Sequence, residues 1–286
     1  MGKIGFMQGR LSPLINGRIQ AFPWQHWRDE FILAQTNGFN LIEWTLDQDD
    51  LYKNPIMTVN GRREIRSLSN KYGISIESLT GDCFMQSPFY KATGSDKQRL
   101  INDLQNIVEA CLEIGIKWIV FPLVDNGRLE NTWQEDDLKK GLSLIEFALK
   151  DGGARIVFES DFTPRLLKEF IVKFPQQVFG INYDIGNSAS QGYGPAEEIN
   201  EYSSYIYNVH VKDRLKGGGT VPLGAGNADL PLVFRLLRES GYVGNFILQT
   251  ARAVDGEHAA VLCNYREMVQ KWLDTVFLTQ PYPYES

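Results

Sequence analysis

Four polar residues stand where predicted β-strands end, and their types are those that bind divalent cations. They are Glu159 in RIVFES, Asp184 in GINYDIG, His210 in YNVHVKD and Gln249 in NFILQT. If these strands are neighbours in one barrel, their oxygen atoms and one imidazole nitrogen meet at the same rim. Such an oxygen-rich shell suits Mn²⁺, Mg²⁺ or Co²⁺ better than a thiolate-type zinc site, and we take Mn²⁺ as the preferred ion. The pattern predicts a metal enzyme.

Each of these residues has a simpler interpretation when it is taken alone. Asp184 could cap the following turn, and His210, one of three histidines, could be a hydrogen-bonded core residue. Their joint occurrence at the ends of four successive predicted strands is what favours a metal site.

Short apolar segments alternate with longer amphipathic segments along the whole chain. The predicted strands cover residues 4–8, 41–46, 75–80, 118–123, 155–159, 179–184, 206–210 and 246–249. The predicted helices cover residues 27–37, 62–72, 96–114, 134–150, 164–174, 196–203, 230–240 and 258–275. Several strands are apolar at consecutive positions, as expected of a parallel sheet covered by helices. Strict alternation of this kind predicts an α/β fold, a single-domain (β/α)8 TIM barrel over residues 1–286, with residues 277–286 as an extended tail.

Glycines and prolines support these boundaries. Gly38, Gly73, Gly115 and Gly241 each follow a predicted helix, where a left-handed residue commonly ends the helix. Thr163 precedes a proline in the pattern of a capped helix start. The alternative, a doubly wound sheet, usually carries GxGxxG after its first strand, and the segment after residue 8 lacks that spacing.

Composition limits the classes of partner. The chain has 286 residues, a formal charge of −6 and a sequence pI near 5.3, which argue against a nucleic-acid-binding surface. No stretch is long and apolar enough for a membrane span or a signal peptide. Cys83, Cys111 and Cys263 are widely spaced and odd in number, which favours reduced thiols and a cytoplasmic location.

Further polar residues follow the predicted strands at the same rim, and we expect them to bind a substrate. They are Glu43, Asp82, Asn187, Lys212, Arg214 and Arg252. The cationic members lie beside the seventh and eighth strands, where many barrels hold phosphate. The glycine-rich segments 217–219 and 224–227 could also present backbone N–H groups to an anion. A phosphorylated or carboxylated small molecule would suit this part of the rim.

Several motifs together resemble the xylose isomerase-like TIM barrels, which include ketose 3-epimerases, sugar-phosphate isomerases and epimerases and, more distantly, endonuclease IV. The motifs are IGFMQGRLS at 4–12, IEW at 42–44, FES at 158–160, YDIGN at 183–187, HVKD at 210–213 and PLGAGNADL at 222–230. The resemblance implies a divalent metal held by two glutamates, an aspartate and a histidine, with the glutamates as acid and base on opposite faces of a sugar. Glu159, Asp184 and His210 match the first three ligands.

Two positions depart from that pattern. Gln249 stands where the resemblance leads us to expect the second glutamate, and an amide can bind a metal but cannot take a proton near neutral pH. Asn187 stands where ketose epimerases of this type often have a histidine. An endonuclease IV-like activity would need many histidines and a basic groove, and the chain has three histidines and an acidic balance.

We therefore expect a sugar or sugar-phosphate isomerase or epimerase in which Glu159 removes a proton next to a carbonyl to give an enediolate. Isomerisation can proceed with one base, whereas epimerisation needs a second group such as Glu43, Asp82 or Lys212. The alternatives are dehydration of a keto-sugar, or a catalytically silent sugar-binding barrel because of Gln249. Aromatic residues in the tail could pack on a neighbouring subunit of a homo-oligomer.

Overall fold

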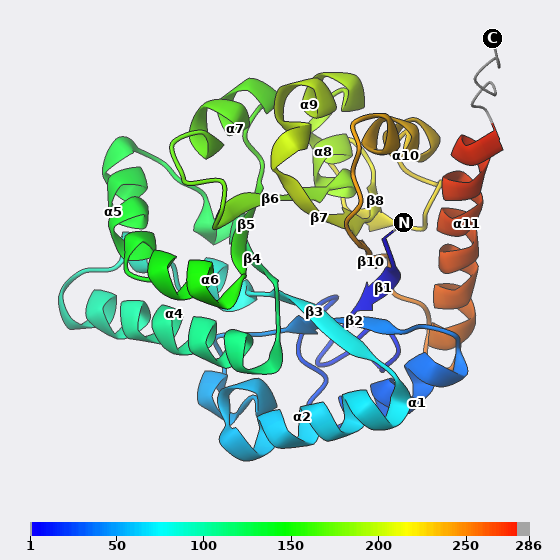
Figure 1. Cartoon of the computed structure of the whole chain (residues 1–286). Coiled ribbons are helices and arrows are strands. Elements are labelled where there is room, and N and C mark those ends of the chain that lie inside the picture. Colours follow the sequence, from blue (N-terminus) through cyan, green and yellow to red (C-terminus); the bar gives the residue numbers. More distant parts are fainter. Residues whose placement is uncertain (1, 279–286) are drawn as a thin grey trace, which may run out of the picture.

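The chain folds into a closed barrel surrounded by helices (Figure 1), in a computed structural model that describes residues 2–278. The barrel strands are β1 (Ile4–Met7), β2 (Leu41–Thr45), β3 (Ser75–Thr80), β4 (Trp118–Leu123), β5 (Arg155–Ser160), β6 (Phe179–Asp184), β7 (Ile206–Val211) and β10 (Phe246–Leu248). Each begins and ends within one residue of its predicted range. The predicted TIM barrel is confirmed.

Strand pairing is parallel throughout the barrel, and neighbours in space are neighbours in the chain. β1 pairs with both β2 and β10, which closes the ring between the first and last barrel strands. Elsewhere in the ring, β6 pairs with β7 so that Asp184 lies directly beside His210. Parallel pairing places all the carboxyl ends of the strands at one rim, which is where the predicted site residues lie.

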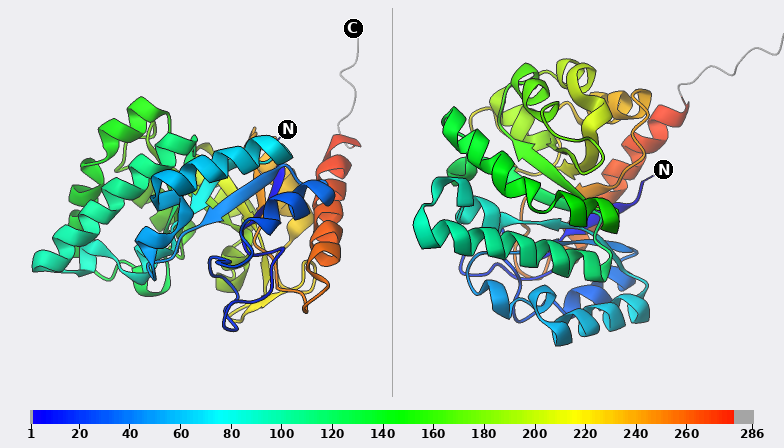
Figure 2. Two further views of the ribbon diagram at one scale, coloured as in Figure 1. Left: turned by 90° about the horizontal axis from the view of Figure 1, so that it is seen from below. Right: turned by 60° about the vertical axis from the view of Figure 1, so that its left-hand side comes forward.

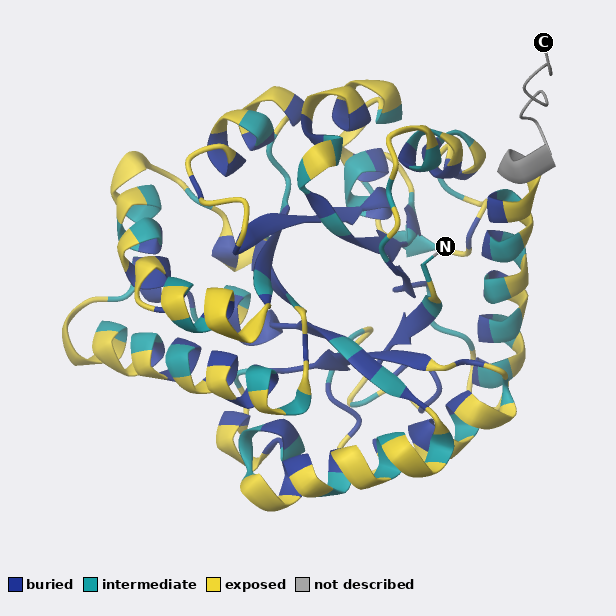
Figure 3. Ribbon diagram, in the orientation of Figure 1, coloured by how far each residue is buried: buried dark blue, intermediate teal, exposed yellow. Residues whose placement is uncertain are grey.

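The helices form the outer layer, with buried faces toward the strands and exposed faces toward solvent (Figure 3). They are α1 (Asp29–Thr36), α2 (Val59–Tyr72), α3 (Asp82–Gln86), α4 (Gly94–Ile114), α5 (Thr132–Ser143), α6 (Glu146–Gly152), α7 (Pro164–Ile171), α8 (Ile185–Gln191), α9 (Pro195–Tyr202), α10 (Leu230–Glu239) and α11 (His258–Leu278). Short 3₁₀ helices occupy Leu51–Lys53, Pro55–Met57, Phe89–Lys91, Asp125–Gly127 and Ser203–Tyr205. α11 lies against β1 and β10, where the ring closes (Figure 2).

Local chemistry sets the helix boundaries. Gly38, Gly73, Gly115 and Gly241 all have φ between +67° and +87°, a left-handed conformation that residues with a Cβ adopt at a cost. The Thr163 hydroxyl accepts the N–H of Leu166 at the start of α7, as predicted.

Four features differ from the sequence-based expectation. The helix predicted over 134–150 is two helices, α5 and α6, and at the break the Ser143 hydroxyl donates to the carbonyl of Lys140. Two short helices, α3 and α8, follow β3 and β6 directly. A small antiparallel hairpin, β8 (Asp213–Arg214) and β9 (Thr220–Val221), follows β7. α11 extends to Leu278, and the rest of the predicted tail lies outside the described residues.

The barrel interior is apolar only in part. Met7, Leu41 and Ile247 form a small buried apolar cluster on the strand face that also carries Glu43 and His210, and Glu43 and Asn208 are completely buried among the strands. Buried polar groups are costly unless they are hydrogen-bonded, so a polar layer inside the barrel points to a functional constraint. Among the helices of the described residues, none combines the length and the apolar composition needed to cross a bilayer.

Candidate functional site

Three of the four predicted metal ligands form a buried cluster at the carboxyl ends of adjacent strands. Glu159 comes from β5, Asp184 from β6 and His210 from β7, and one ligand atom of each lies within 4.8 Å of the others. His210 Nδ1 is 3.1 Å from Glu159 Oε2 and 4.0 Å from Asp184 Oδ2. The side chains converge because each strand ends at the same rim of the barrel, as the sequence predicted.

The imidazole of His210 lies between two carboxylates. Its Nε2 is 2.7 Å from Glu43 Oε1, on the side away from Asp184. Burial by itself lowers the pKa of His210, but the charges and hydrogen bonds of Glu43 and Glu159 outweigh burial and raise that pKa to about 10. When one ring nitrogen of a histidine binds a metal, the other commonly donates its N–H to a carboxylate, and Glu43 is placed to accept it.

Glu159 is held by two asparagines, one on each carboxylate oxygen. Asn182 donates to Oε2 at 2.8 Å, and Asn187 donates to Oε1 at 2.7 Å. Burial raises the pKa of Glu159. The hydrogen bond and the charge of His210 lower that pKa by more than burial raises it, so the net pKa lies below its usual range. Glu159 is therefore ionised at neutral pH, with its two oxygens oriented by fixed amide donors.

The side chain of Lys212 links the fourth predicted ligand, Gln249, to the cluster. The Lys212 ammonium lies 2.7 Å from Asp184 Oδ2 and donates to Gln249 Oε1 at 2.9 Å. Burial raises the pKa of Asp184, Lys212 lowers it and the charge of Glu159 raises it again, with a net shift upward. The oxygens of Asp184 and Gln249 thus share one positive charge.

Arg214 and Arg252, two of the predicted substrate-binding residues, hold other parts of the protein. Arg214 donates to Asn187 Oδ1 at 2.8 Å and, through two other nitrogens, to the carbonyl of Gly218. Arg252 donates to the carbonyls of Gly9 and Ser12 in the loop after β1. Their contact with a substrate stays a prediction.

In the glycine-rich segment 224–227, two backbone N–H groups are already bonded within the protein and are not available to an external anion. The buried carboxylate of Asp213 accepts the N–H groups of Gly224 and Gly226, each at 2.9 Å, and that of Ala228 at 3.1 Å. The anion that the sequence led us to expect there is supplied by the chain itself.

Sequence reasoning missed Asn182, Asn208 and Gln20. Asn208 donates to Glu43 Oε2 and to Asn182 Oδ1, each at 2.9 Å, so that it joins the two polar sides of the barrel. A signal existed for the asparagines, because each stands two residues before a predicted ligand and therefore on the same face of its strand. For Gln20, in the loop between β1 and α1, no such signal exists.

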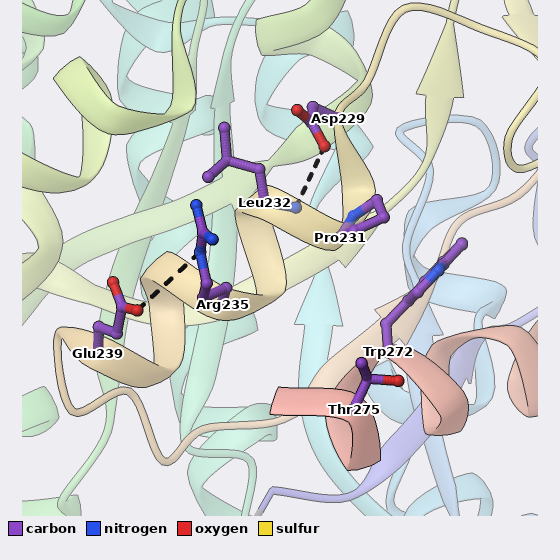
Figure 4. Close-up of a pocket in the computed structure, with 7 residues that line it drawn as sticks. All are labelled: Asp229, Pro231, Leu232, Arg235, Glu239, Trp272 and Thr275. Carbon is purple, nitrogen blue, oxygen red and sulfur yellow. Dashed lines mark hydrogen bonds and ion pairs between the residues drawn. The ribbon is translucent and has the colours of Figure 1, made fainter. Parts of the chain in front are cut away.

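A cavity of about 620 Å³ lies elsewhere, on the outside of the barrel between α10 and α11 (Figure 4). Asp229, Arg235 and Trp272 contribute to its wall, and none of its lining residues belongs to the cluster around Glu159. This outer cavity is therefore separate from the candidate site at the barrel rim.

Comparison with known proteins identifies the family. Residues 31–272 match the family described as xylose isomerase-like TIM barrel. The chain belongs to this family. It is 23% identical over 258 residues to L-ribulose-5-phosphate 3-epimerase UlaE of Escherichia coli strain K12, covering 85% of this chain and 89% of that protein.

Solved structures agree in fold with the xylose isomerase-like barrel. A xylose isomerase domain protein from Planctomyces limnophilus has a TM-score of 0.74 at 16% identity, covering 97% of this chain and 98% of that chain. An L-ribulose 3-epimerase has a TM-score of 0.73 at 14% identity, covering 99% and 100%. A family member from Mycobacterium smegmatis in complex with magnesium has a TM-score of 0.70 at 16% identity, covering 96% and 98%. The family and its epimerase relatives identify the chain as an isomerase.

Proposed function

We propose that this chain is a divalent-metal-dependent isomerase or epimerase of a sugar or sugar phosphate. The observation that carries the proposal is the buried cluster of Glu159, Asp184 and His210 at one rim of the barrel. Similarity to an L-ribulose-5-phosphate 3-epimerase supports a phosphorylated ketose as the substrate class. We retain Mn²⁺ as the preferred ion and the cytoplasm as the expected location.

The donor set suits a hard divalent cation. Glu159, Asp184 and Gln249 offer oxygen atoms and His210 offers Nδ1, while Glu43 stands behind the imidazole as its carboxylate partner. The oxygens of Asp184 and Gln249 already share the ammonium of Lys212, so this part of the site is built to hold positive charge. A bound cation would withdraw electron density from a carbonyl and its neighbouring hydroxyl.

Glu159 is the proposed base. Its low pKa keeps it ionised at neutral pH, and Asn182 and Asn187 fix the direction in which its oxygens point. It removes the proton from the carbon next to the carbonyl, and the electron pair of that C–H bond moves into the enediolate. In an aldose–ketose isomerisation Glu159 can return the proton to the neighbouring carbon.

Substrate binding is proposed for the polar residues that surround this base. Lys212 and Asn187 lie in direct contact with predicted ligands, and Arg214 stands behind Asn187. Asp82 and Arg252 both contact the segment after β1, Asp82 through Gln20 and Arg252 through the carbonyl of Gly9. Cations on this rim favour an anionic sugar over a neutral one.

Deuterium exchange tests the proposal whatever the product. Purified protein loaded with Mn²⁺ is incubated in deuterated water with L-ribulose 5-phosphate and with unphosphorylated ketoses. We expect deuterium at the carbon next to the carbonyl, and we expect Glu159→Gln to reduce that exchange by about 100-fold or more. Glu113→Gln, which changes a glutamate on the outer helix α4 that pairs with Arg62 on α2, should retain exchange. Full exchange in Glu159→Gln would reject Glu159 as the base.

A silent sugar-binding barrel is the second candidate, because Gln249 carries no acid group where the family resemblance implies glutamate. It predicts that the protein binds Mn²⁺ and a sugar without exchange of deuterium. Dehydration of a keto-sugar, in contrast, predicts exchange together with loss of a hydroxyl group, which mass spectrometry of the product distinguishes.

A further inference from the structure

Epimerisation through Glu159 needs a second acid on the other face of the substrate, and Gln249 cannot serve. Two other candidates at the rim are already engaged. Glu43 is completely buried, and its oxygens accept hydrogen bonds from Thr80 and Asn208 and contact His210. Lys212 is ion-paired with Asp184 and bonded to Gln249. Both oxygens of Glu43 are therefore occupied, and the Lys212 ammonium is held by two residues of the candidate site.

Asp82 differs from both. It is the first residue of α3, directly beyond β3, and its side chain lies at the barrel mouth with 7% of the residue exposed. Gln20 donates to Asp82 Oδ2 at 2.5 Å. The other oxygen, Oδ1, accepts no hydrogen bond from any residue between 2 and 278. One oxygen is therefore anchored, and the other remains available.

A single bridging side chain connects Asp82 to the position of the missing glutamate. Gln249 Nε2 donates to Gln20 Oε1 at 2.9 Å, and the amide of Gln20 in turn donates to Asp82. Asp82 therefore stands one side chain beyond Gln249. It comes from the end of β3 and Glu159 from the end of β5, with β4 between them, so the two carboxyl groups approach the mouth from different strands.

The surroundings of Asp82 favour a group that exchanges its proton near neutral pH. Burial, followed by the nearby charges of Asp47 and Glu159, raises the pKa of Asp82 to about 7, while Gln20 and His210 act in the opposite direction. Asp47 itself is fixed by the N–H of Phe22 and the amide of Gln86. A general acid works best when its pKa lies close to the working pH.

We propose that Asp82 is the second acid–base residue of this enzyme and that the reaction is an epimerisation. The inference rests on the proposed function. After Glu159 has taken the proton from one face, the C–H bond electrons reside in the enediolate. The Asp82 O–H then gives its proton to the same carbon from the other face, where a new C–H bond forms. Asp82 ends ionised and Glu159 ends protonated, and exchange with water restores both.

The variant Asp82→Asn separates the two half-reactions. We expect formation of the epimer from L-ribulose 5-phosphate to fall by about 100-fold or more, because amide N–H is not an acid at neutral pH. Exchange of deuterium into the unepimerised substrate should continue, since Glu159 alone removes and returns that proton. Asp103→Asn is the matched control, because Asp103 is equally buried but lies on the outer helix α4. It should leave both rates unchanged.

The outcomes distinguish this inference from the proposed function. Epimer formation at the wild-type rate in Asp82→Asn overturns the role of Asp82, and so does a wild-type protein that exchanges deuterium but never forms an epimer. If the wild-type protein exchanges no deuterium with any ketose, the proposed function fails and the inference falls with it.

The pH profile provides a readout that a merely structural role would not change. Above about pH 7 Asp82 loses the proton it must donate, so kcat/KM for epimer formation should fall about tenfold per pH unit. The decline should be the same for the forward and the reverse epimerisation, because the equilibrium between the two epimers does not depend on pH. Exchange through Glu159 should not show it. A flat epimerisation profile up to about pH 9 would contradict the assignment.

Discussion

Lys212 links two residues that a metal ion would also need. Its ammonium contacts Asp184 and Gln249, and its side chain is 11% exposed, so the contact is largely shielded from solvent. Charge-assisted contacts in such surroundings are stronger than those at the surface. A divalent cation bound at the proposed site would compete with the ammonium for both oxygens, so we expect Lys212 to tune the affinity of that site for metal.

Replacing Lys212 by methionine should strengthen metal binding. The substitution keeps a long side chain but removes the competing charge, so we expect the Kd for Mn²⁺ to fall about tenfold, equivalent to about 1.4 kcal/mol. Isothermal titration of the metal-free protein measures it. Lys216→Met removes the same charge from an exposed position of the hairpin and should leave the Kd almost unchanged. Weaker binding in Lys212→Met would mean that Lys212 assists the metal.

The hairpin β8–β9 and the segment after it depend on one buried carboxylate. Asp213 is completely buried and accepts three backbone N–H groups from residues 224–228. Gly226 is required there, since a Cβ at this position would lie 2.1 Å from Asp213 Oδ1. The aspartate of the HVKD motif thus orders the chain between β7 and α10, next to the strand end that carries His210.

Asp213→Ala should destabilise the fold. Three N–H groups would lose their charged acceptor, and we expect the free energy of unfolding to fall by about 3 kcal/mol. Urea denaturation measures this change. Asp229→Ala removes a single cap at the start of α10, where the carboxylate accepts the Leu232 N–H, and should cost about 1 kcal/mol. An equal loss in the two variants would show that Asp213 acts as an ordinary cap.

At the scale of the whole molecule, closure of the barrel creates the site. β1 and β2 contribute Glu43 and the loop that carries Gln20, whereas β5 to β10 contribute the predicted ligands. The polar layer that joins them runs across the interior through Asn182 and Asn208. Occupation of the site by a cation therefore acts on strands from both halves of the chain and should stabilise the barrel as a unit.

Metal should raise the stability of the whole protein. At a Mn²⁺ concentration of about 100 times the Kd, a ligand that binds only the folded state adds about 2.7 kcal/mol to the free energy of unfolding. Urea denaturation with Mn²⁺ and with a chelator measures the difference. Asp184→Asn should abolish most of it. Identical unfolding curves in the two conditions would contradict metal binding at the cluster.

Much of the fold and part of the site follow from local patterns. The strand ends at Glu159, Asp184 and His210 are set by apolar segments, and the parallel barrel then requires these ends to share a rim. The break between α5 and α6 and the hairpin after β7 were missed, because each depends on a few hydrogen bonds and not on a periodic pattern.

Residue order along the chain determined which side chains the rim would carry, because strand periodicity and capping act over a few residues. Tertiary structure alone decided how those side chains pair. Glu43 meets His210 across 167 positions, and Gln20 meets Gln249 across 229. Contacts of that range exist only once the ring has closed. Closure buries Asp82 and thereby raises its pKa, and it brings to His210 the carboxylates that raise the pKa of the imidazole.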